Sequence, residues 1–186
     1  PSGAESWGRV ARSGIDVLPD ARPLQADLDG AGDGGHVVVL AGPDAERYLG
    51  GVLARDIRAC RPGQAQYTIW CDGDGFVNED GVVFRHSAEE FMLTAAEPNL
   101  AYFADLVGRS RVQIEEVTEE WGSLAVQGPR AHAVLSQLAP EVSSLGYFDH
   151  TTAKLGNTAV WISRTGFTGD LGYEVFCAAA DAPAVW

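Results

Sequence analysis

The sequence predicts an α+β fold made of two similar halves, each an antiparallel sheet with helices on one face. The first reason is a repeat, because residues 38–49 and 124–135 both read as an apolar strand, a Gly-Pro turn and an amphipathic helix. In each copy glycine permits a tight turn, and proline stands where a helix begins and needs no N–H donor. The second reason is a series of short β-rich runs separated by Asp-Gly and other glycine-rich turns. We place the two halves at about residues 36–115 and 116–186.

The elements of the first half follow from local patterns. Residues 67–77 predict a hairpin, since two β-rich runs flank an Asp-Gly-Asp-Gly turn. Residues 81–85 continue as a strand, and residues 90–95 predict the next one. Residues 99–107 predict a helix, because their apolar residues recur at helical spacing.

The second half continues with strands and turns. Residues 158–163 and 173–177 predict strands, and the glycine-rich segment 166–172 between them predicts a loop. Residues 182–186 read as the first turn of a helix. In contrast, residues 1–35 are weakly patterned and rich in Gly, Asp and Pro, so we expect a flexible connector there.

The composition is that of a globular cytoplasmic protein and excludes several classes of partner. Hydrophobic residues make up 46 % of the 186 residues, which is enough for a core. No apolar run reaches the roughly 18 residues that a membrane span needs, and the first residues lack the apolar segment of a signal peptide. The formal net charge is −13 without any cluster of Lys or Arg, so we expect neither nucleic acid nor an anionic membrane surface as a partner.

The cysteines and histidines do not predict a metal site. Three cysteines stand far apart in the sequence, and the four histidines share no metal-ligand spacing. A disulfide framework is equally unexpected from an odd number of separated cysteines. No Gly-x-Ser-x-Gly motif positions a nucleophile, so a covalent mechanism is not expected either.

Two carboxylates are unusual in their positions. Asp80 lies at the mouth of an apolar strand that follows the hairpin, where a charged group either caps the turn or points into a site. Glu174 lies in an aromatic strand, in which alternation places it on the face of Phe176 and opposite to Tyr173 and Val175. The pattern alone leaves open whether that face is solvated or lines a site.

The loop over residues 163–172 is a third candidate. It contains three glycines and several hydroxyl side chains. Glycines of this kind let the backbone approach a ligand closely, but an ordinary long hairpin turn explains them equally well.

Five segments of the chain resemble the aminomethyltransferase family, which includes the T-protein of the glycine cleavage system. The segments occur in the family's order within residues 36–186, and they are 39–49, 62–68, 77–84, 125–129 and 164–174. Each segment is short, but five in the right order are specific. The resemblance implies two related α+β domains and a third β-barrel domain, which would follow Trp186, around a central folate channel.

The resemblance also implies roles for four residues. Asp80 corresponds to the catalytic carboxylate beside the reactive pterin nitrogen, and Glu174 to a hydrogen-bond partner of the pterin ring. The latter role is physically reasonable, because a carboxylate pairs bidentately with the amino and imino donors of the ring. Tyr67 and Phe167 correspond to aromatic residues that line the folate pocket. The family usually has Tyr at the position of Phe167, so stacking is kept and a hydroxyl contact is lost.

Two departures from the family pattern bear on the reaction. Ala96 takes the place of an Asn that contacts the pterin, and Gly81 replaces a larger apolar residue, which we expect to enlarge the pocket. Both departures suit the wider family better than the glycine cleavage reaction. That wider family includes demethylases of methoxy or methylthio compounds and the folate modules of sarcosine- and dimethylglycine-oxidising flavoproteins.

The resemblance therefore implies a transferase of one-carbon groups that uses tetrahydrofolate. A small-molecule one-carbon donor or a lipoyl carrier protein would be its partner. An alternative of another class is a non-catalytic folate-binding protein of the kind that assists iron–sulfur assembly. Such proteins carry a cysteine in the loop that here is residues 164–172, whereas this loop has none and Asp80 is retained.

Overall fold

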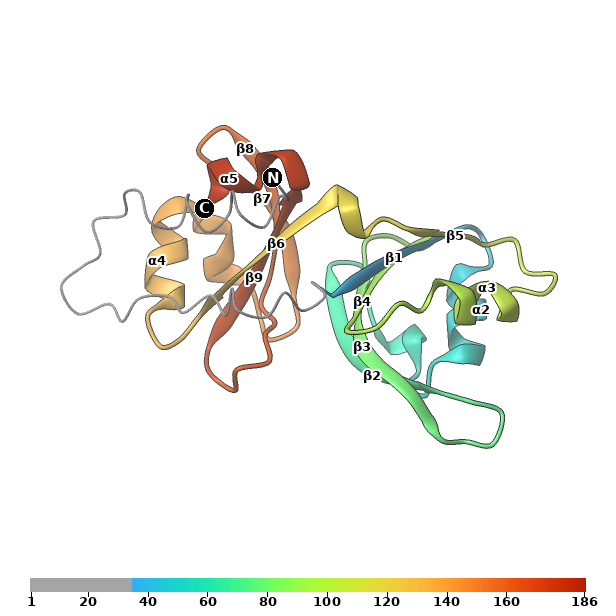
Figure 1. Cartoon of the computed structure of the whole chain (residues 1–186). Coiled ribbons are helices and arrows are strands. Elements are labelled where there is room, and N and C mark those ends of the chain that lie inside the picture. The colour runs from blue at the N-terminus through green and yellow to red at the C-terminus, as the bar shows by residue number, and fades with distance from the viewer. Residues whose placement is uncertain (1–34) are drawn as a thin grey trace.

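The computed structural model describes residues 35–186, which form two α+β halves lying side by side (Figure 1). The strands of each sheet pair antiparallel, and helices cover one face of each sheet, so the predicted fold class is confirmed. The connector expected over residues 1–35 lies outside the described residues apart from Gly35. Within residues 35–186 no helix has the length and apolar character needed to cross a membrane.

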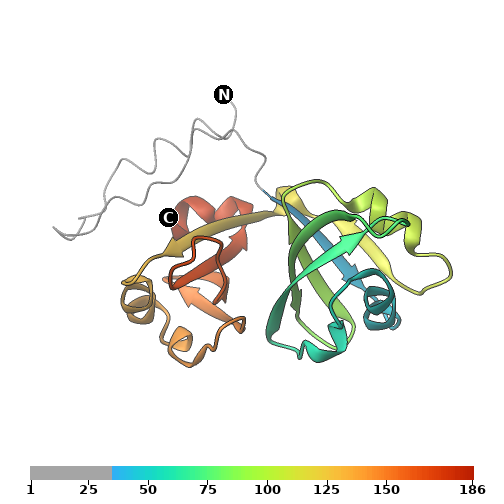
Figure 2. The ribbon, with the colours of Figure 1, turned by 90° about the horizontal axis from the view of Figure 1, so that it is seen from below.

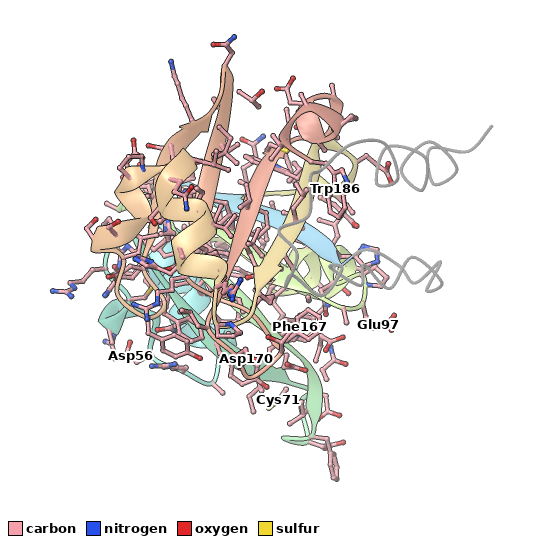
Figure 3. The ribbon with its side chains drawn as sticks, turned by 90° about the vertical axis from the view of Figure 1, so that its left-hand side faces the viewer. Asp56, Cys71, Glu97, Phe167, Asp170 and Trp186 are labelled. Atoms are coloured by element: carbon pink, nitrogen blue, oxygen red, sulfur yellow. The ribbon has the colours of Figure 1, made fainter. Side chains whose placement is uncertain are left out.

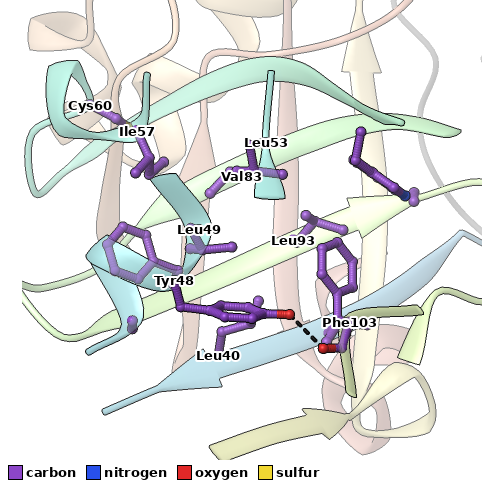
Figure 4. Packing of buried hydrophobic residues seen from close by; sticks show 14 residues of the cluster. Leu40, Tyr48, Leu49, Leu53, Ile57, Cys60, Val83, Leu93 and Phe103 are labelled. Carbon is purple, nitrogen blue, oxygen red and sulfur yellow. Dashed lines mark hydrogen bonds between the residues drawn. The ribbon is translucent and has the colours of Figure 1, made fainter. Parts of the chain in front are cut away.

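The first sheet has the strand order β2-β3-β4-β1-β5, and α2 and α3 cover one of its faces. The core beneath these helices includes Leu40, Leu49 and Phe103, and the Tyr48 hydroxyl donates a hydrogen bond to the Phe103 carbonyl (Figure 4). The elements are β1 (His36–Ala41), α2 (Ala45–Val52), η1 (Ile57–Ala59), β2 (Gln64–Cys71), β3 (Val77–Arg85), β4 (Glu90–Ala95), α3 (Leu100–Leu106) and β5 (Gln113–Glu116).

The second sheet has the strand order β6-β9-β8-β7. Helix α4 packs on one face through Ala131 and Leu135, which contact a core that includes Ile162 and Val175. The elements are η2 (Thr118–Glu120), β6 (Trp121–Gln127), α4 (Ala131–Leu138), η3 (Pro140–Ser144), β7 (His150–Leu155), β8 (Thr158–Ser163), β9 (Gly172–Ala178), η4 (Ala179–Asp181) and α5 (Ala182–Val185).

The faces of the two sheets that carry no helices meet at a junction. In Figure 2, α2 and α3 lie on the side of the first sheet that is turned away from the second half, and α4 lies on the side of the second sheet that is turned away from the first half. Phe84 of β3 packs against Trp161 of β8 and Phe176 of β9, with ring centroids 4.6 and 5.7 Å apart. Buried aromatic pairs of this kind each contribute about 1 kcal/mol beyond the area that they bury. This aromatic cluster fixes which faces look toward each other.

A short backbone bridge also joins the halves. Gln64 at the start of β2 pairs antiparallel with Asp149, and the amide of Ala65 donates to the Phe148 carbonyl over 2.7 Å. The His150 amide donates in turn to the Gly63 carbonyl over 2.9 Å. The junction is therefore held by side-chain packing and by backbone hydrogen bonds at one edge.

The two Gly-Pro repeats adopt the same local structure. Gly42 and Gly128 have φ angles of 144° and 114°, and each carbonyl accepts a hydrogen bond of 3.0 Å from the alanine three positions later. The helices begin at that alanine, so the proline lies in the turn and not in the first helical turn as expected. Proline suits the second position of such a turn because its φ is already fixed there.

Candidate functional site

Asp80 and Tyr67 lie on the junction face of the first sheet. In the pairing of β2 with β3, Ile69 stands opposite Asp80 and Tyr67 stands opposite Val82. Because side chains alternate along a strand, Asp80 and Val82 share the face of Phe84, and Tyr67 lies beside them. Asp80 therefore does not cap the hairpin turn, which was one of the two expectations, but points from within β3 to the side of the second half.

The immediate surroundings of Asp80 are open and polar. Asp80 is exposed, and Tyr67 is 48 % exposed. Hydrogen bonding to the Asp80 side chain raises the pKa of the Tyr67 hydroxyl, with partial desolvation adding to the effect. A carboxylate and a phenol in contact at the solvent boundary can hold and exchange a proton.

Glu174 lies on the junction face of the second sheet. In β9 it stands opposite Ser163 of β8 and Ala125 of β6, and it shares a face with Phe176. This face is not solvated, because Phe176 is buried in the aromatic cluster and Glu174 itself is only partly exposed. The structure thus decides between the two interpretations that the pattern left open.

The Glu174 carboxylate is held by neighbouring hydroxyl groups. The buried Thr165 hydroxyl donates a hydrogen bond to Glu174 Oε2 and lies 2.9 Å from the Ser163 hydroxyl. Burial raises the pKa of Glu174, and the hydrogen bond from Thr165 opposes that rise. Within residues 35–186, Glu174 Oε1 has no hydrogen-bond partner and is not sealed from solvent. That oxygen is free to accept hydrogen bonds from a ligand.

Both carboxylates lie toward the same end of the junction. Along β3 the chain reaches Asp80 before Phe84, and along β9 it reaches Glu174 before Phe176. The hairpin between β2 and β3 and the loop between β8 and β9 both extend to the lower side of the molecule in Figure 1. In Figure 3 the labelled residues Cys71, Phe167 and Asp170 lie at that lower side too. The two carboxylates, on facing sheets, therefore share one open end.

Phe167 lies at the edge of this end, in the loop between β8 and β9. Its ring is 90 % exposed, so it makes no packing contact that would explain an aromatic residue there. Tyr67 of the first half and Phe167 of this loop therefore place one aromatic ring on each side of the opening.

The loop is attached to the sheet by Gln127, whose role the sequence did not reveal. The Gln127 amide donates to the Tyr173 carbonyl over 3.0 Å and to the Thr165 carbonyl over 3.4 Å. A Cβ atom at Gly166 or Gly172 would come within 2.3 or 1.6 Å of Gln127 Oε1, so a side chain at either position would displace the Gln127 amide. The Gln-Gly-Pro segment is visible in the sequence, but its contact with a loop 38 positions away is not.

Gly81 does not enlarge the space beside Asp80, which corrects the expectation from the sequence. It follows Asp80 in β3 and so points to the opposite face, beneath the helices. A Cβ atom there would lie 2.3 Å from the Thr94 carbonyl oxygen and 3.1 Å from the Trp70 ring. Gly81 is therefore required by packing in the core. Ala96, by contrast, is exposed directly after β4 and offers no polar side-chain atom.

The structure has a groove, but it does not lie at the open end between the sheets. A groove of about 770 Å³ lies elsewhere, along β7, β8 and the end of β9, and includes Trp121, Lys154 and Asp181. None of the four candidate residues lines this groove. Within the described part of the chain, no three His, Cys, Asp or Glu side chains are grouped as a metal site.

Comparisons with known proteins agree on one family. The family profile described as "GCVT N-terminal domain" matches residues 36–186. An aminomethyltransferase of Saccharopolyspora erythraea is 34 % identical over 152 residues, which cover 79 % of this chain and 41 % of that protein. The gamma subunit of a heme-dependent oxidative N-demethylase of Ectopseudomonas mendocina is 38 % identical over 151 residues, covering 80 % of this chain and 40 % of that subunit.

A solved structure supports the fold. The glycine cleavage system aminomethyltransferase T of Bartonella henselae matches with a TM-score of 0.72 at 23 % identity, covering 83 % of this chain and 42 % of that one. At this identity the match speaks for the fold alone. The chain spans less than half the length of the two curated relatives.

Proposed function

Because the chain belongs to the aminomethyltransferase family, we propose that it binds tetrahydrofolate and takes part in the transfer of a one-carbon unit to it. The observation that carries the proposal is the placement of Asp80 and Glu174 on facing sheets at one open end. Tyr67 and Phe167 add an exposed aromatic ring on each side. Two carboxylates and two rings suit a ligand that is flat, rich in N–H donors and partly cationic when it reacts.

Glu174 binds the pterin ring in this proposal. Its Oε1 is open, its Oε2 is fixed by Thr165, and its partial burial strengthens each hydrogen bond that it accepts. An ionised carboxylate accepts two parallel N–H donors, which matches the amino and ring N–H groups of a pterin. Glu174 therefore acts mainly in affinity and orientation.

Asp80 handles the proton of the reaction. When bound, tetrahydrofolate supplies the nucleophilic nitrogen that accepts the one-carbon unit. The Asp80 carboxylate accepts the proton that this nitrogen releases and stabilises the positive charge that develops beside it. Contact with solvent lets Asp80 pass the proton on, and the Tyr67 hydroxyl lies near enough to Asp80 for the pKa of Tyr67 to be raised by it.

The one-carbon donor distinguishes two versions of the function. An aminomethyl group on a lipoyl carrier protein would make this chain part of an aminomethyltransferase. A small donor would instead make it the folate module of a demethylase or of a sarcosine- or dimethylglycine-type oxidase. A methyl ether or sulfonium would transfer a methyl group, whereas an oxidising partner would release formaldehyde. Two observations favour the second version: the 38 % identity to a demethylase subunit and Ala96 at the position of the family's Asn. Both versions should be tested.

The test is calorimetric titration of the full-length protein with tetrahydrofolate under reducing conditions. We expect wild type and Asp80→Asn to bind, and Glu174→Gln to bind much more weakly. Glu141→Gln and Asp105→Asn are matched controls, because both residues are exposed and lie on elements away from the site. Absence of binding by wild type would overturn the proposal, and equal binding by Glu174→Gln would remove its central residue.

A further inference from the structure

Thr165 is the residue whose hydrogen bond fixes the side chain of Glu174. It lies just after β8, is 3 % exposed, and donates its hydroxyl hydrogen to Glu174 Oε2. The Ser163 hydroxyl, fully buried, lies 2.9 Å from the Thr165 oxygen and can donate to it in turn. The three side chains form one chain of hydrogen bonds that ends on a single carboxylate oxygen.

These hydrogen bonds leave the other carboxylate oxygen of Glu174, Oε1, in one defined position. A glutamate side chain has three rotatable bonds, and without a partner its carboxylate samples several orientations at an open surface. Here Thr165 holds Oε2, and Oε1 is left in contact with solvent and without a partner among residues 35–186. We propose that Thr165 is a positioning residue that holds Glu174 in the orientation needed to bind the pterin, an inference that rests on the proposed function.

Gln127 makes the arrangement rigid. Its amide hydrogens go to the carbonyl groups of Thr165 and of Tyr173, which directly precedes Glu174. One side chain of β6 thus fixes the backbone of both the donor and the acceptor of the critical hydrogen bond. Gly166 and Gly172 leave the Gln127 amide in this place, since a Cβ atom at either position would displace it.

The hydrogen bond also affects whether Glu174 is charged. Burial raises the pKa of this carboxyl group, and donation from Thr165 lowers it again. Removal of the donor alone should therefore raise the pKa of Glu174. If the ionised carboxylate binds the pterin, the acid limb of the binding profile moves to higher pH with it.

The experiment compares Thr165→Val, which keeps the shape and loses the hydroxyl, with Thr165→Ser, which keeps the hydroxyl. The first measurement is the titration of the Glu174 side-chain carboxyl group by carbon NMR in the full-length protein without ligand. The second is the affinity for tetrahydrofolate as a function of pH. We expect Thr165→Val to raise the pKa of Glu174 and to weaken binding about tenfold on the acid limb. Thr165→Ser should behave as wild type in both measurements.

Three results would overturn the inference. An unchanged Glu174 titration in Thr165→Val would show that the hydroxyl does not act on the carboxylate. Equal loss of affinity at every pH in both variants would indicate a purely structural role. Failure of wild type to bind tetrahydrofolate, together with a shifted titration in Thr165→Val, would remove the folate role along with the proposed function while leaving the contact itself demonstrated.

A second variant keeps the test decisive if Thr165→Val does not fold. Ser163→Ala removes the next hydroxyl group in the chain and leaves Thr165 in place. We expect a smaller shift of the Glu174 titration in the same direction. A hydrogen bond from Ser163 to the Thr165 hydroxyl polarises that hydroxyl and strengthens the bond that it donates to Glu174. An unchanged titration in Ser163→Ala would then overturn the inference.

Discussion

Asp80 of the first half and Glu174 of the second stand on facing sheets, yet their surroundings differ. Asp80 is exposed and has the Tyr67 hydroxyl as its neighbour, whereas Glu174 is half-buried and is held by Thr165 and, through it, Ser163. A carboxylate fixed in a low-dielectric setting suits oriented hydrogen bonding, and one in contact with water suits proton exchange. In the proposed function, this difference supports folate binding by Glu174 in one half and proton transfer by Asp80 in the other.

The sharpest test of these separate roles is the Asp80→Asn variant, measured in the complete one-carbon transfer reaction with donor and tetrahydrofolate. We expect turnover to fall by about 100-fold or more, which is typical when a general acid or base is removed. Affinity for tetrahydrofolate should stay within about threefold, because the exchange keeps the size and polarity of the side chain. Single-turnover kinetics beside calorimetry separates the two effects. A loss confined to affinity would reverse the roles assigned to the two carboxylates.

The complementary change is Glu174→Gln. Hydrogen bonds to a charged group are stronger than neutral ones, so we expect binding of tetrahydrofolate to weaken about 30-fold. Turnover at saturating tetrahydrofolate should change much less than in Asp80→Asn. Glu141→Gln carries the same charge change at a distant exposed site and should leave both quantities as in wild type. A strong fall in turnover at saturation would show that Glu174 acts in the chemical step.

The junction that brings the two carboxylates face to face should weaken in acid because of His150. Its Nδ1 accepts a hydrogen bond of 2.7 Å from the Trp161 indole, and its Nε2 donates to the Arg85 carbonyl over 3.1 Å, so the folded protein holds the neutral ring. Burial and the nearby His86 lower the pKa of His150 from 6.5 to about 4.

The sign of the pH effect follows from this lowered pKa. Between pH 6.5 and pH 4 the unfolded chain binds the proton and the folded chain does not, so the free energy of unfolding falls as the pH falls through this range. We expect His150 to account for about 2 kcal/mol of that fall. Denaturant unfolding at several pH values should show a smaller fall in His150→Gln, which can make both hydrogen bonds without titrating. An identical fall in both proteins would contradict the assignment.

The smallest expected effect concerns Gly81, the neighbour of Asp80 that points the other way. Gly81→Ala places a methyl group against the Thr94 carbonyl and the Trp70 ring, so we expect a loss of about 1.5 kcal/mol in the free energy of unfolding. Gly73→Ala is the control, because no atom lies within 4 Å of its Cβ position. If Gly81→Ala instead altered folate affinity at unchanged stability, Gly81 would face the site after all.

Much of the fold was predictable because its signals are local. The hairpin at residues 67–77, the helix at 99–107 and the strand at 158–163 all correspond to observed elements, since turn residues and apolar periodicity act over a few positions. The strands β5 and β7 were not predicted. Gln113–Glu116 and His150–Leu155 are short or largely polar, and they become strands only because a neighbouring strand offers its backbone.

The candidate site was only partly predictable. The sequence and its resemblance nominated Asp80, Glu174, Tyr67 and Phe167, and their roles remain proposals. Alternation placed Glu174 on the face of Phe176 correctly, but it could not tell that this face is buried against the other sheet. Thr165 and Gln127 were not nominated, because neither a hydroxyl in a turn-rich loop nor an amide at the end of a strand has a distinctive spacing.

The sequence by itself determined the α+β class, the repeated strand-turn-helix plan and the two carboxylates. Glycine, proline and apolar spacing specify these features through contacts between residues near in the chain. Only the tertiary structure decided which faces meet, that Gly81 serves the core, and that Thr165 holds Glu174. The meeting of the two faces rests on contacts such as the one from Gln64 to Asp149, 85 positions apart, and even the Thr165–Glu174 contact, 9 positions apart, joins a loop to a neighbouring strand. Such contacts depend on the packing of whole sheets, and no local pattern encodes them.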